Sequence, residues 1–337
     1  MNKETGTIRR IIEILPKSEF LQNEFFQSDS EIIEIQGRKL LFSMDDFSKE
    51  DFFRDDAPYQ LGSNVAIATI SDILASGGDP LMYAHSMSID TSTWDKHYID
   101  AFSEGIAAVL KEIGAGFIGG DLGRSDSWKY TGVAIGETHR PITRIGTKEG
   151  DIIFMTGMVG AGNIEATMNL VLNNNFLGNK IDLPRLKLKI RQKESLLIRE
   201  YATSCIDTSD GVLSGLNTFA ELNHVGYQID NLKYSPEGIR LSQIIGKPLC
   251  LLFMGECGEY ELLFTINPQQ LDQFVAEAEK KNLEFTQIGL ITAEGNKSLA
   301  EADKSVNFMN FDIRARDFEQ IEEYLTELIN YVEKNRK

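Results

Sequence analysis

Several short apolar runs in this chain lead directly into an aspartate, and this pattern limits how the chain can fold. The aspartates concerned are Asp45 and Asp46 after KLLFSM, Asp72 in VAIATISD, Asp121 after GFIGG, and Asp207 and Asp210 in CIDTSDG. Magnesium prefers carboxylate oxygens and usually reaches a protein through one or two carboxylates plus the phosphates of a substrate. The repeated pattern therefore favours an α/β chain with a magnesium-phosphate site.

The composition fits two domains. At 337 residues the chain is about twice the usual size of one domain, and its 42% of hydrophobic residues can form two ordinary cores. The net charge of −17 argues against a nucleic-acid surface, because such a surface needs clustered Lys and Arg. An acidic site that holds ATP must also recruit a divalent metal, which offsets the repulsion between carboxylates and phosphates.

The sequence predicts no membrane span and no zinc site. Its longest apolar stretches fall far short of the roughly 20 residues that a transmembrane helix needs. The first residues contain basic side chains but lack the apolar core of a signal peptide, so the cytoplasm is the expected location. Cys205, Cys250 and Cys257 are too few and wrongly spaced for zinc, and we expect them to be reduced thiols.

The first part of the chain alternates strand and helix signals in the order β-β-α-β-α-β-β. Residues 31–36 and 39–44 indicate a hairpin, and residues 62–76 a helix that stops at Gly77 and Gly78 before Pro80. The remaining expected elements are a strand over 81–89, a helix over 94–113, and strands over 116–120 and 130–137.

A polar, glycine-containing stretch over residues 143–151 predicts a boundary between domains 1–145 and 146–337. After it the pattern restarts with a strand at 152–157. The expected helices lie beyond Gly162, over 192–203, from Asp210 or Gly211 onward, over 269–281 and over 314–334, and the expected strands lie at 226–230, 260–266 and 285–291. Both halves are therefore expected to be α/β or α+β domains.

The GGD segment has two interpretations. Gly119 and Gly120 permit a tight turn in which backbone amides approach a ligand, with Asp121 at the end of a buried strand. Arg124 then stands where a guanidinium can meet a phosphate. The alternative is a plain strand-to-loop turn in which Asp121 is a local cap.

The segment IDTSDG precedes a helical pattern. If Ser209 or Asp210 caps that helix, the first helical amides point at any anion bound there, and Asp207 faces the same space. The alternative is that Asp210 is only an N-cap.

Ser71 and Asp72 interrupt an otherwise apolar helix pattern. A buried carboxylate is costly unless it is paired or bound to metal, so a functional role is favoured for Asp72. Asp45 and Asp46 are neighbours on a strand and point to opposite faces. We expect Asp45 to reach the site and Asp46 to be a solvated turn residue.

Glu256, Glu259 and Glu261 form an acidic stretch beside a strand, and its simplest interpretation is a strand edge exposed to water. The four histidines show no arrangement of nucleophile and base, and we expect them to be structural.

Taken in order, these segments resemble the thiamine-monophosphate kinase branch of the aminoimidazole ribonucleotide synthetase (AIR synthase) superfamily. The matching segments are residues 43–46, ISDILASGGDP at 70–80, GGDLGR at 119–124, RIGTKEGD and FMTG within 144–157, DTSDG at 207–211 and GEYEL at 258–262. Each motif alone is weak, whereas their ordered set is specific.

The resemblance implies a homodimer of two-domain subunits in which the amino-terminal domains pair into a barrel-like sheet. It implies that ATP and Mg²⁺ bind near the dimer interface, and that phosphoryl transfer is direct, without a covalent intermediate. By motif match the metal contacts are Asp45, Asp72, Asp121 and Asp210. The catalytic residues are Asp121, Asp210 and Arg124, and the nucleotide contacts are Ser71, Gly119, Gly120, Asp121, Arg144 and Ser209.

The chain also departs from the family pattern. Where the family has a glycine-rich segment that contributes an aspartate to the metals, residues 21–31 read LQNEFFQSDSE, which predicts fewer metal contacts. Leu122 replaces a threonine after GGD, and the substrate-side motifs are poorly matched.

The expected function is an ATP- and Mg²⁺-dependent kinase acting on thiamine phosphate or a related small metabolite. The alternatives are another ATP-dependent synthase or ligase of the superfamily, and a non-catalytic dimeric nucleotide-binding regulator.

Overall fold

The structure is a computed structural model that describes residues 3–49, 51, 57–170, 186–301 and 304–336. Its amino-terminal part contains a five-stranded sheet with the strand order β1-β2-β5-β3-β4. The strands are β1 (Glu31–Ile35), β2 (Arg38–Ser48), β3 (Asp79–Ile89), β4 (Gly116–Arg124) and β5 (Lys129–Glu137). The β3 and β4 strands run parallel, and the other neighbours in this sheet are antiparallel.

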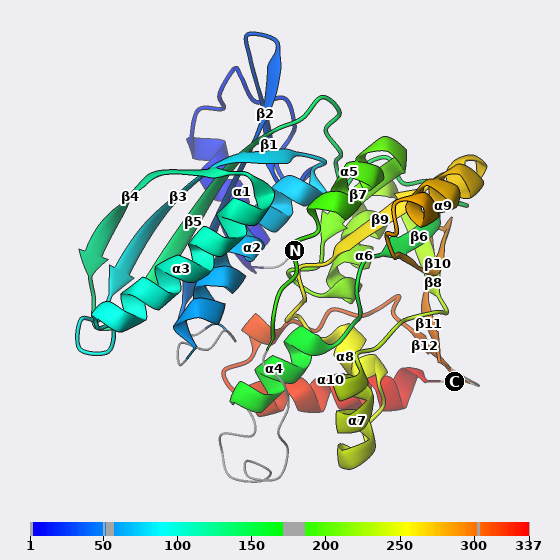
Figure 1. The fold of residues 1–337 in the computed structure, drawn as a ribbon. Helices are drawn as coiled ribbons and strands as arrows, with labels where there is room; N and C mark the ends of the chain where they lie inside the picture. Colours follow the sequence, from blue (N-terminus) through cyan, green and yellow to red (C-terminus); the bar gives the residue numbers. More distant parts are fainter. Residues whose placement is uncertain (1–2, 50, 52–56, 171–185, 302–303, 337) are drawn as a thin grey trace.

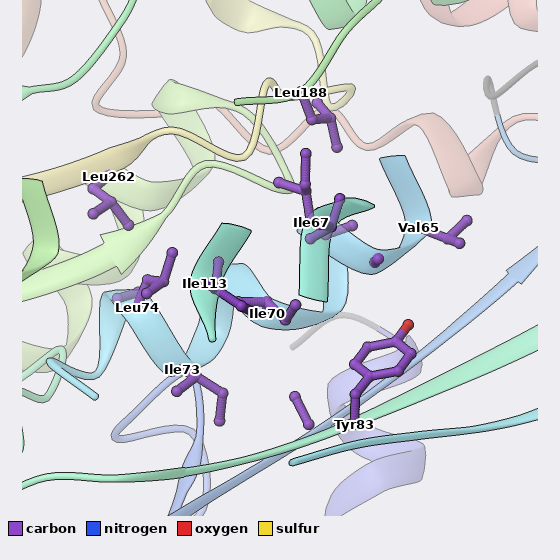
Figure 2. Close-up of a cluster of buried hydrophobic side chains, with 14 of the residues drawn as sticks. Val65, Ile67, Ile70, Ile73, Leu74, Tyr83, Ile113, Leu188 and Leu262 are labelled. Carbon is purple, nitrogen blue, oxygen red and sulfur yellow. The ribbon is translucent and has the colours of Figure 1, made fainter. Parts of the chain in front are cut away.

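Two helices, α2 (Pro58–Ala75) and α3 (Lys96–Ile113), pack on one face of this sheet, while the preceding helix α1 (Lys3–Ile14) begins the described chain (Figure 1). Most of α2 is buried, which agrees with its apolar sequence on all sides. Figure 2 shows Ile67, Ile70 and Leu74 of this helix among side chains of both parts of the chain, including Tyr83 and Leu262. The helix therefore joins the two halves through a shared core.

The carboxy-terminal part is built on a seven-stranded sheet with the order β12-β11-β8-β10-β6-β9-β7. Its strands are β6 (Ile152–Met155), β7 (Ala202–Asp207), β8 (Val225–Ile229), β9 (Leu262–Ile266), β10 (Thr286–Ala293), β11 (Lys297–Glu301) and β12 (Lys304–Asn307). The helices are α4 (Ala161–Leu170), α5 (Gln192–Tyr201), α6 (Val212–Asn223), α7 (Pro236–Ile245), α8 (Cys250–Met254), α9 (Leu271–Lys280) and α10 (Ile321–Asn335).

The element order predicted from the first strand onward is confirmed for the first half, but helix α1 was not predicted and two strands continue well past their expected ends. The β2 strand continues through Asp45 and Asp46 to Ser48. The β4 strand continues through Gly119 and Asp121 to Arg124, so the predicted tight turn at GGD is wrong. Ladder hydrogen bonds to β3 hold this segment extended, which local glycine content could not indicate.

In the second half, residues 202–203 begin β7 rather than ending a helix, and the last helix begins at Ile321 rather than near residue 314. The short helices α7 and α8 and the strands β11 and β12 were not predicted. Among the described helices, none is both long and apolar enough to cross a bilayer. The division into domains 1–145 and 146–337 remains a proposal.

Candidate metal and phosphate site

Three aspartates from distant parts of the chain meet where the two halves join. Asp29 lies in the loop before β1, Asp72 is on α2, and Asp207 ends β7. Each offers a carboxylate oxygen, and these oxygens all lie within 4.8 Å of one another. We call Asp29, Asp72 and Asp207 the carboxylate cluster.

Ser71 and Asp72 bring α2 into contact with both sheets. The Ser43 hydroxyl of β2 donates a hydrogen bond of 2.7 Å to Asp72 Oδ2, and the Ser71 hydroxyl donates to Asp207 Oδ2. Burial raises the pKa of Asp72 well above its ordinary value, and the nearby carboxylates of Asp45 and Asp207 add to this shift. Without a cation, such a group holds its proton more tightly than an exposed aspartate does.

Asp29 forms a buried ion pair that uses only one of its oxygens. Arg144 Nε donates to Asp29 Oδ1 at 3.0 Å, and Nη2 of the same guanidinium donates to the same oxygen. The Asp29 side chain is 1% exposed. Its other oxygen, Oδ2, is buried and has no hydrogen-bond partner in the described structure. Burial raises the pKa of Asp29 to about 7 despite the opposing charge of Arg144.

The turn after β7 is fixed by its own side chains and by a close backbone contact. Ser209 donates to Asp207 Oδ1 from its backbone N at 3.3 Å and from its hydroxyl at 2.8 Å. A Cβ at Gly258 would lie 1.4 Å from the Thr208 carbonyl oxygen, so only glycine fits there. The N-cap of α6 is Gly211, without a side-chain cap, so the predicted capping by Ser209 or Asp210 is wrong.

Asp45 and Asp210 lie around the carboxylate cluster. Burial raises the pKa of Asp45 to about 7, and the charges of Asp207, Asp29 and Asp210 contribute. Burial also raises the pKa of Asp210, again with Asp207 as the strongest neighbouring charge. Asp45 follows Ser43 by two residues on β2 and so shares the face that meets α2.

Asp46 points to the other face of the sheet, where it accepts a hydrogen bond of 2.7 Å from the Thr131 hydroxyl. Asp121 shares that face, because the strand register aligns Asp46 with Thr131, Thr131 with Ser86, and Ser86 with Asp121. We call this face of the five-stranded sheet, opposite α2, the outer face. Asp46 is thus within a strand and not a turn residue.

Asp121 is exposed, so its predicted place at the end of a buried strand is wrong. With Gly119, Gly120 and Arg124, it lies on β4, the edge strand of the sheet. Three strand spacings separate β4 from β2, which is about 14 Å. Within one chain, the structure therefore does not bring these residues to the carboxylate cluster.

The interpretation of Glu259 and Glu261 as an exposed acidic edge is wrong, because both are buried and 6% exposed. Glu259 Oε1 accepts from the backbone N of Gly160 at 2.7 Å and of Gly162 at 3.0 Å. Glu261 is paired with Arg191, whose Nη2 donates to it at 2.6 Å. These side chains connect the residues just before β9 to the start of α4 and to Arg191.

Asp29 was not predicted as a site residue. Residues 21–31 were expected to lack the amino-terminal aspartate because the segment has no glycine. The structure corrects this, since Asp29 lies in that segment and in the carboxylate cluster. No local pattern in this segment marks Asp29, because its pairing with Arg144 spans 115 residues of sequence.

The carboxylate cluster suits a hard divalent cation. Three carboxylates converge there, one buried oxygen of Asp29 is unpartnered, and burial raises the pKa values of Asp29 and Asp72. A bound Mg²⁺ ion accepts such oxygens as ligands and removes the cost of ionising them together.

Comparison with known proteins agrees with this arrangement. Residues 27–138 match the family described as AIR synthase related protein, N-terminal domain. That part of the chain is therefore similar to proteins of the AIR synthase-related superfamily. That match includes Asp29, Asp45, Asp72 and Asp121 and ends before the second sheet begins.

The curated relatives extend the similarity across most of the chain. The thiamine-monophosphate kinase of Pyrococcus horikoshii is 29% identical over 248 residues, covering 73% of this chain and 76% of the relative. The thiamine-monophosphate kinase of Aquifex aeolicus is 26% identical, covering 86% of this chain and 92% of the relative. The solved structure of AaThiL complexed with AMPPCP and TMP shares the fold, with a TM-score of 0.72 and 23% identity over 88% of this chain and 92% of that one.

Proposed function

We propose that this protein is an ATP- and Mg²⁺-dependent phosphotransferase that phosphorylates thiamine phosphate, a step in thiamine diphosphate biosynthesis. The observation that carries the proposal is the carboxylate cluster, in which three converging carboxylates include one buried and unpartnered oxygen. The relatives named above as thiamine-monophosphate kinases support the choice of reaction and acceptor. The structure of AaThiL with AMPPCP, an analogue of ATP, supports the choice of nucleotide.

Asp29, Asp72 and Asp207 are the residues that would hold Mg²⁺, and the charges of Asp45 and Asp210 act on the same cluster. The metal supplies charge neutralisation for the transferring phosphoryl group. The chain itself orients these carboxylates. Ser43 holds Asp72, Ser71 and Ser209 hold Asp207, and Arg144 fixes one oxygen of Asp29. The catalytic role of the protein is thus positioning, and no side chain needs to become a covalent intermediate.

We further propose that two copies of the chain pair through the five-stranded sheet. The edge strand β4 exposes large apolar side chains, with Phe117 exposed by 52%, Ile118 by 58% and Leu122 by 64%. Met44 on the outer face is exposed by 61%. Exposed apolar side chains next to a sheet edge are typical of an interface.

Pairing gives Asp121 a role that it does not have within one chain. Asp121 is exposed on the outer face, away from its own carboxylate cluster. We propose that Asp121, with Gly119, Gly120 and Arg124, completes the phosphate site of the partner subunit. The homodimer is then a requirement for catalysis rather than an accessory feature.

The alternative of a non-catalytic regulator rested on the missing glycine-rich segment, and Asp29 weakens that support by supplying an aspartate from the same part of the chain. Because the reaction consumes ATP and all three cysteines are free thiols, we propose the cytoplasm as its location.

Phosphorus NMR tests the proposed reaction. Incubation of the protein with ATP, Mg²⁺ and thiamine phosphate is expected to give ADP and a diphosphate resonance, and chelation of Mg²⁺ is expected to stop both. Consumption of ATP without a new diphosphate would instead favour a synthase or ligase, and no consumption with a panel of phosphorylated metabolites would favour a regulator.

A further inference from the structure

The carboxy-terminal part contains a cavity of about 220 Å³ between α4, α7, α8 and α10, which lie together in Figure 1. Most of its lining is aliphatic, from Ala166, Leu241, Ile245, Leu252, Leu325 and Leu328. An apolar cavity of about 150 Å³ is large enough for benzene. This cavity therefore has room for one ring with a short substituent.

One end of the cavity adjoins the turn that carries Asp210. Gly255, Glu256 and Cys257 line that end. The next residue, Gly258, donates its backbone N–H to the Ser209 carbonyl at 3.0 Å. Glu256 is also close enough to Asp210 for its charge to help raise the pKa of that aspartate, after burial and Asp207. The cavity wall and the Asp210 turn are thus in direct contact.

Tyr324 of α10 adds an unpaired polar group to this apolar lining. Its side chain lines the cavity, and the residue is only 4% exposed. Its hydroxyl oxygen is buried and has no hydrogen-bond partner in the described structure. Leaving a buried hydroxyl without a well-formed hydrogen bond costs free energy, so this group is available to a ligand atom in the cavity. Both the charge and the backbone of Glu256 act on the pKa of Tyr324, so the hydroxyl lies toward the Asp210 end and close to the Glu256 backbone.

We propose that this cavity binds the apolar, ring-bearing body of the phosphoryl acceptor, and that the Tyr324 hydroxyl hydrogen-bonds a polar atom of that body. The acceptor then lies with its phosphate at the carboxylate cluster and its ring between α8 and α10. This inference rests on the proposed function and deepens it, because it makes α10 a determinant of acceptor specificity. Acceptors that carry a phosphate but no ring are expected to be poor substrates.

Steady-state kinetics with thiamine phosphate and ATP test the inference. Leu325→Trp fills the cavity and is expected to raise the KM for thiamine phosphate by at least about tenfold, while the KM for ATP stays within about twofold. The matched control is Glu327→Trp, which adds the same side chain on the exposed face of α10 and is expected to behave as the wild type. Tyr324→Phe keeps the shape of the ring and is expected to raise the same KM roughly threefold to tenfold.

The outcomes separate this inference from the proposed function. An unchanged ATP KM shows that each variant is folded. Normal KM values for thiamine phosphate in both Leu325→Trp and Tyr324→Phe would overturn the acceptor role of the cavity and leave the kinase activity standing. Absence of turnover in the wild type with thiamine phosphate would overturn the proposed function first, and with it this role of the cavity.

Discussion

Arg144 and Asp29 form a buried ion pair in which the guanidinium contacts only Oδ1 of the carboxylate. The other oxygen, Oδ2, is buried and has no hydrogen-bond partner among the described residues, and the Asp29 carboxylate lies beside those of Asp72 and Asp207. Arg144 lies in the connection between the two sheets, whereas Asp29 precedes the first strand. This ion pair therefore connects the loop before β1 to the segment between the two sheets, and it leaves Oδ2 of Asp29 available to a cation.

Magnesium alone is expected to raise the thermal unfolding midpoint of the protein, because it binds the folded carboxylate cluster and not the unfolded chain. Asp72→Asn removes like-charge repulsion from the cluster, so the metal-free variant is expected to be more stable than the metal-free wild type. The same variant is expected to lose the gain from magnesium. Calorimetric scans with and without Mg²⁺ measure both effects.

The control for this prediction is Asp46→Asn, on the outer face, which is expected to keep the wild-type response to magnesium. A full magnesium response in Asp72→Asn would count against a metal role for that residue.

Mixing two inactive variants is expected to restore activity if Asp121 serves the partner's site. An Asp72→Asn subunit lacks a residue of its own site, and an Asp121→Asn subunit lacks the residue that it supplies to its partner. A dimer with one subunit of each kind therefore keeps one intact site. Random reassociation gives about half mixed dimers, each with one of two sites intact, so about a quarter of wild-type activity should return. If Asp121 acted within its own chain, the mixture would remain inactive.

Ile118→Glu is expected to convert the dimer into monomers, since it places a charge among the exposed apolar side chains of β4. Sedimentation velocity measures the change. Ile244→Glu is the matched control, because Ile244 is exposed by 49% on α7, far along the chain from the sheet edge. An unchanged dimer in Ile118→Glu would place the interface elsewhere.

Glu259 is expected to make the protein less stable as the pH rises. Burial raises its pKa from 4.5 to about 7, so the folded state holds the proton over a range in which the unfolded state has lost it. The stabilisation is complete below pH 4.5 and disappears as the pH passes 7, which corresponds to roughly 3 kcal/mol of unfolding free energy.

Glu259→Gln is expected to remove this contribution, so that the variant gains stability relative to the wild type between pH 5 and 8 in urea titrations. The exposed Glu284→Gln is expected to follow the wild-type profile. Parallel profiles for Glu259→Gln and the wild type would show that Glu259 titrates normally.

The order of elements from β1 to β5 could be predicted from sequence because the signals are local: α2 is apolar throughout, and α3 and β3 show apolar periodicity. Ser71 and Asp72 stood out for the same reason, since they interrupt a helix that is otherwise apolar. The local pattern also predicted that Asp45 and Asp46 point to opposite faces of the sheet, because side chains alternate along β2.

The remaining features depend on contacts between distant segments. Asp29 joins the site through Arg144, which is 115 residues away, and no local pattern marks it. The GGD segment is extended because β3 pairs with it, although its glycines favour a turn. Glu261 is buried because Arg191, 70 residues earlier, neutralises it. A prediction that considers the residues of one helix or strand at a time cannot detect such long-range pairings.

Calorimetric titration of ATP into the wild type and into Asp29→Asn is the most direct test of the magnesium site. The account predicts ATP binding that requires Mg²⁺ in the wild type and weakens by at least about tenfold, or 1.4 kcal/mol, in Asp29→Asn. Asp46→Asn is expected to bind as the wild type does. ATP binding that is independent of Mg²⁺, or equal in Asp29→Asn and the wild type, would contradict the account.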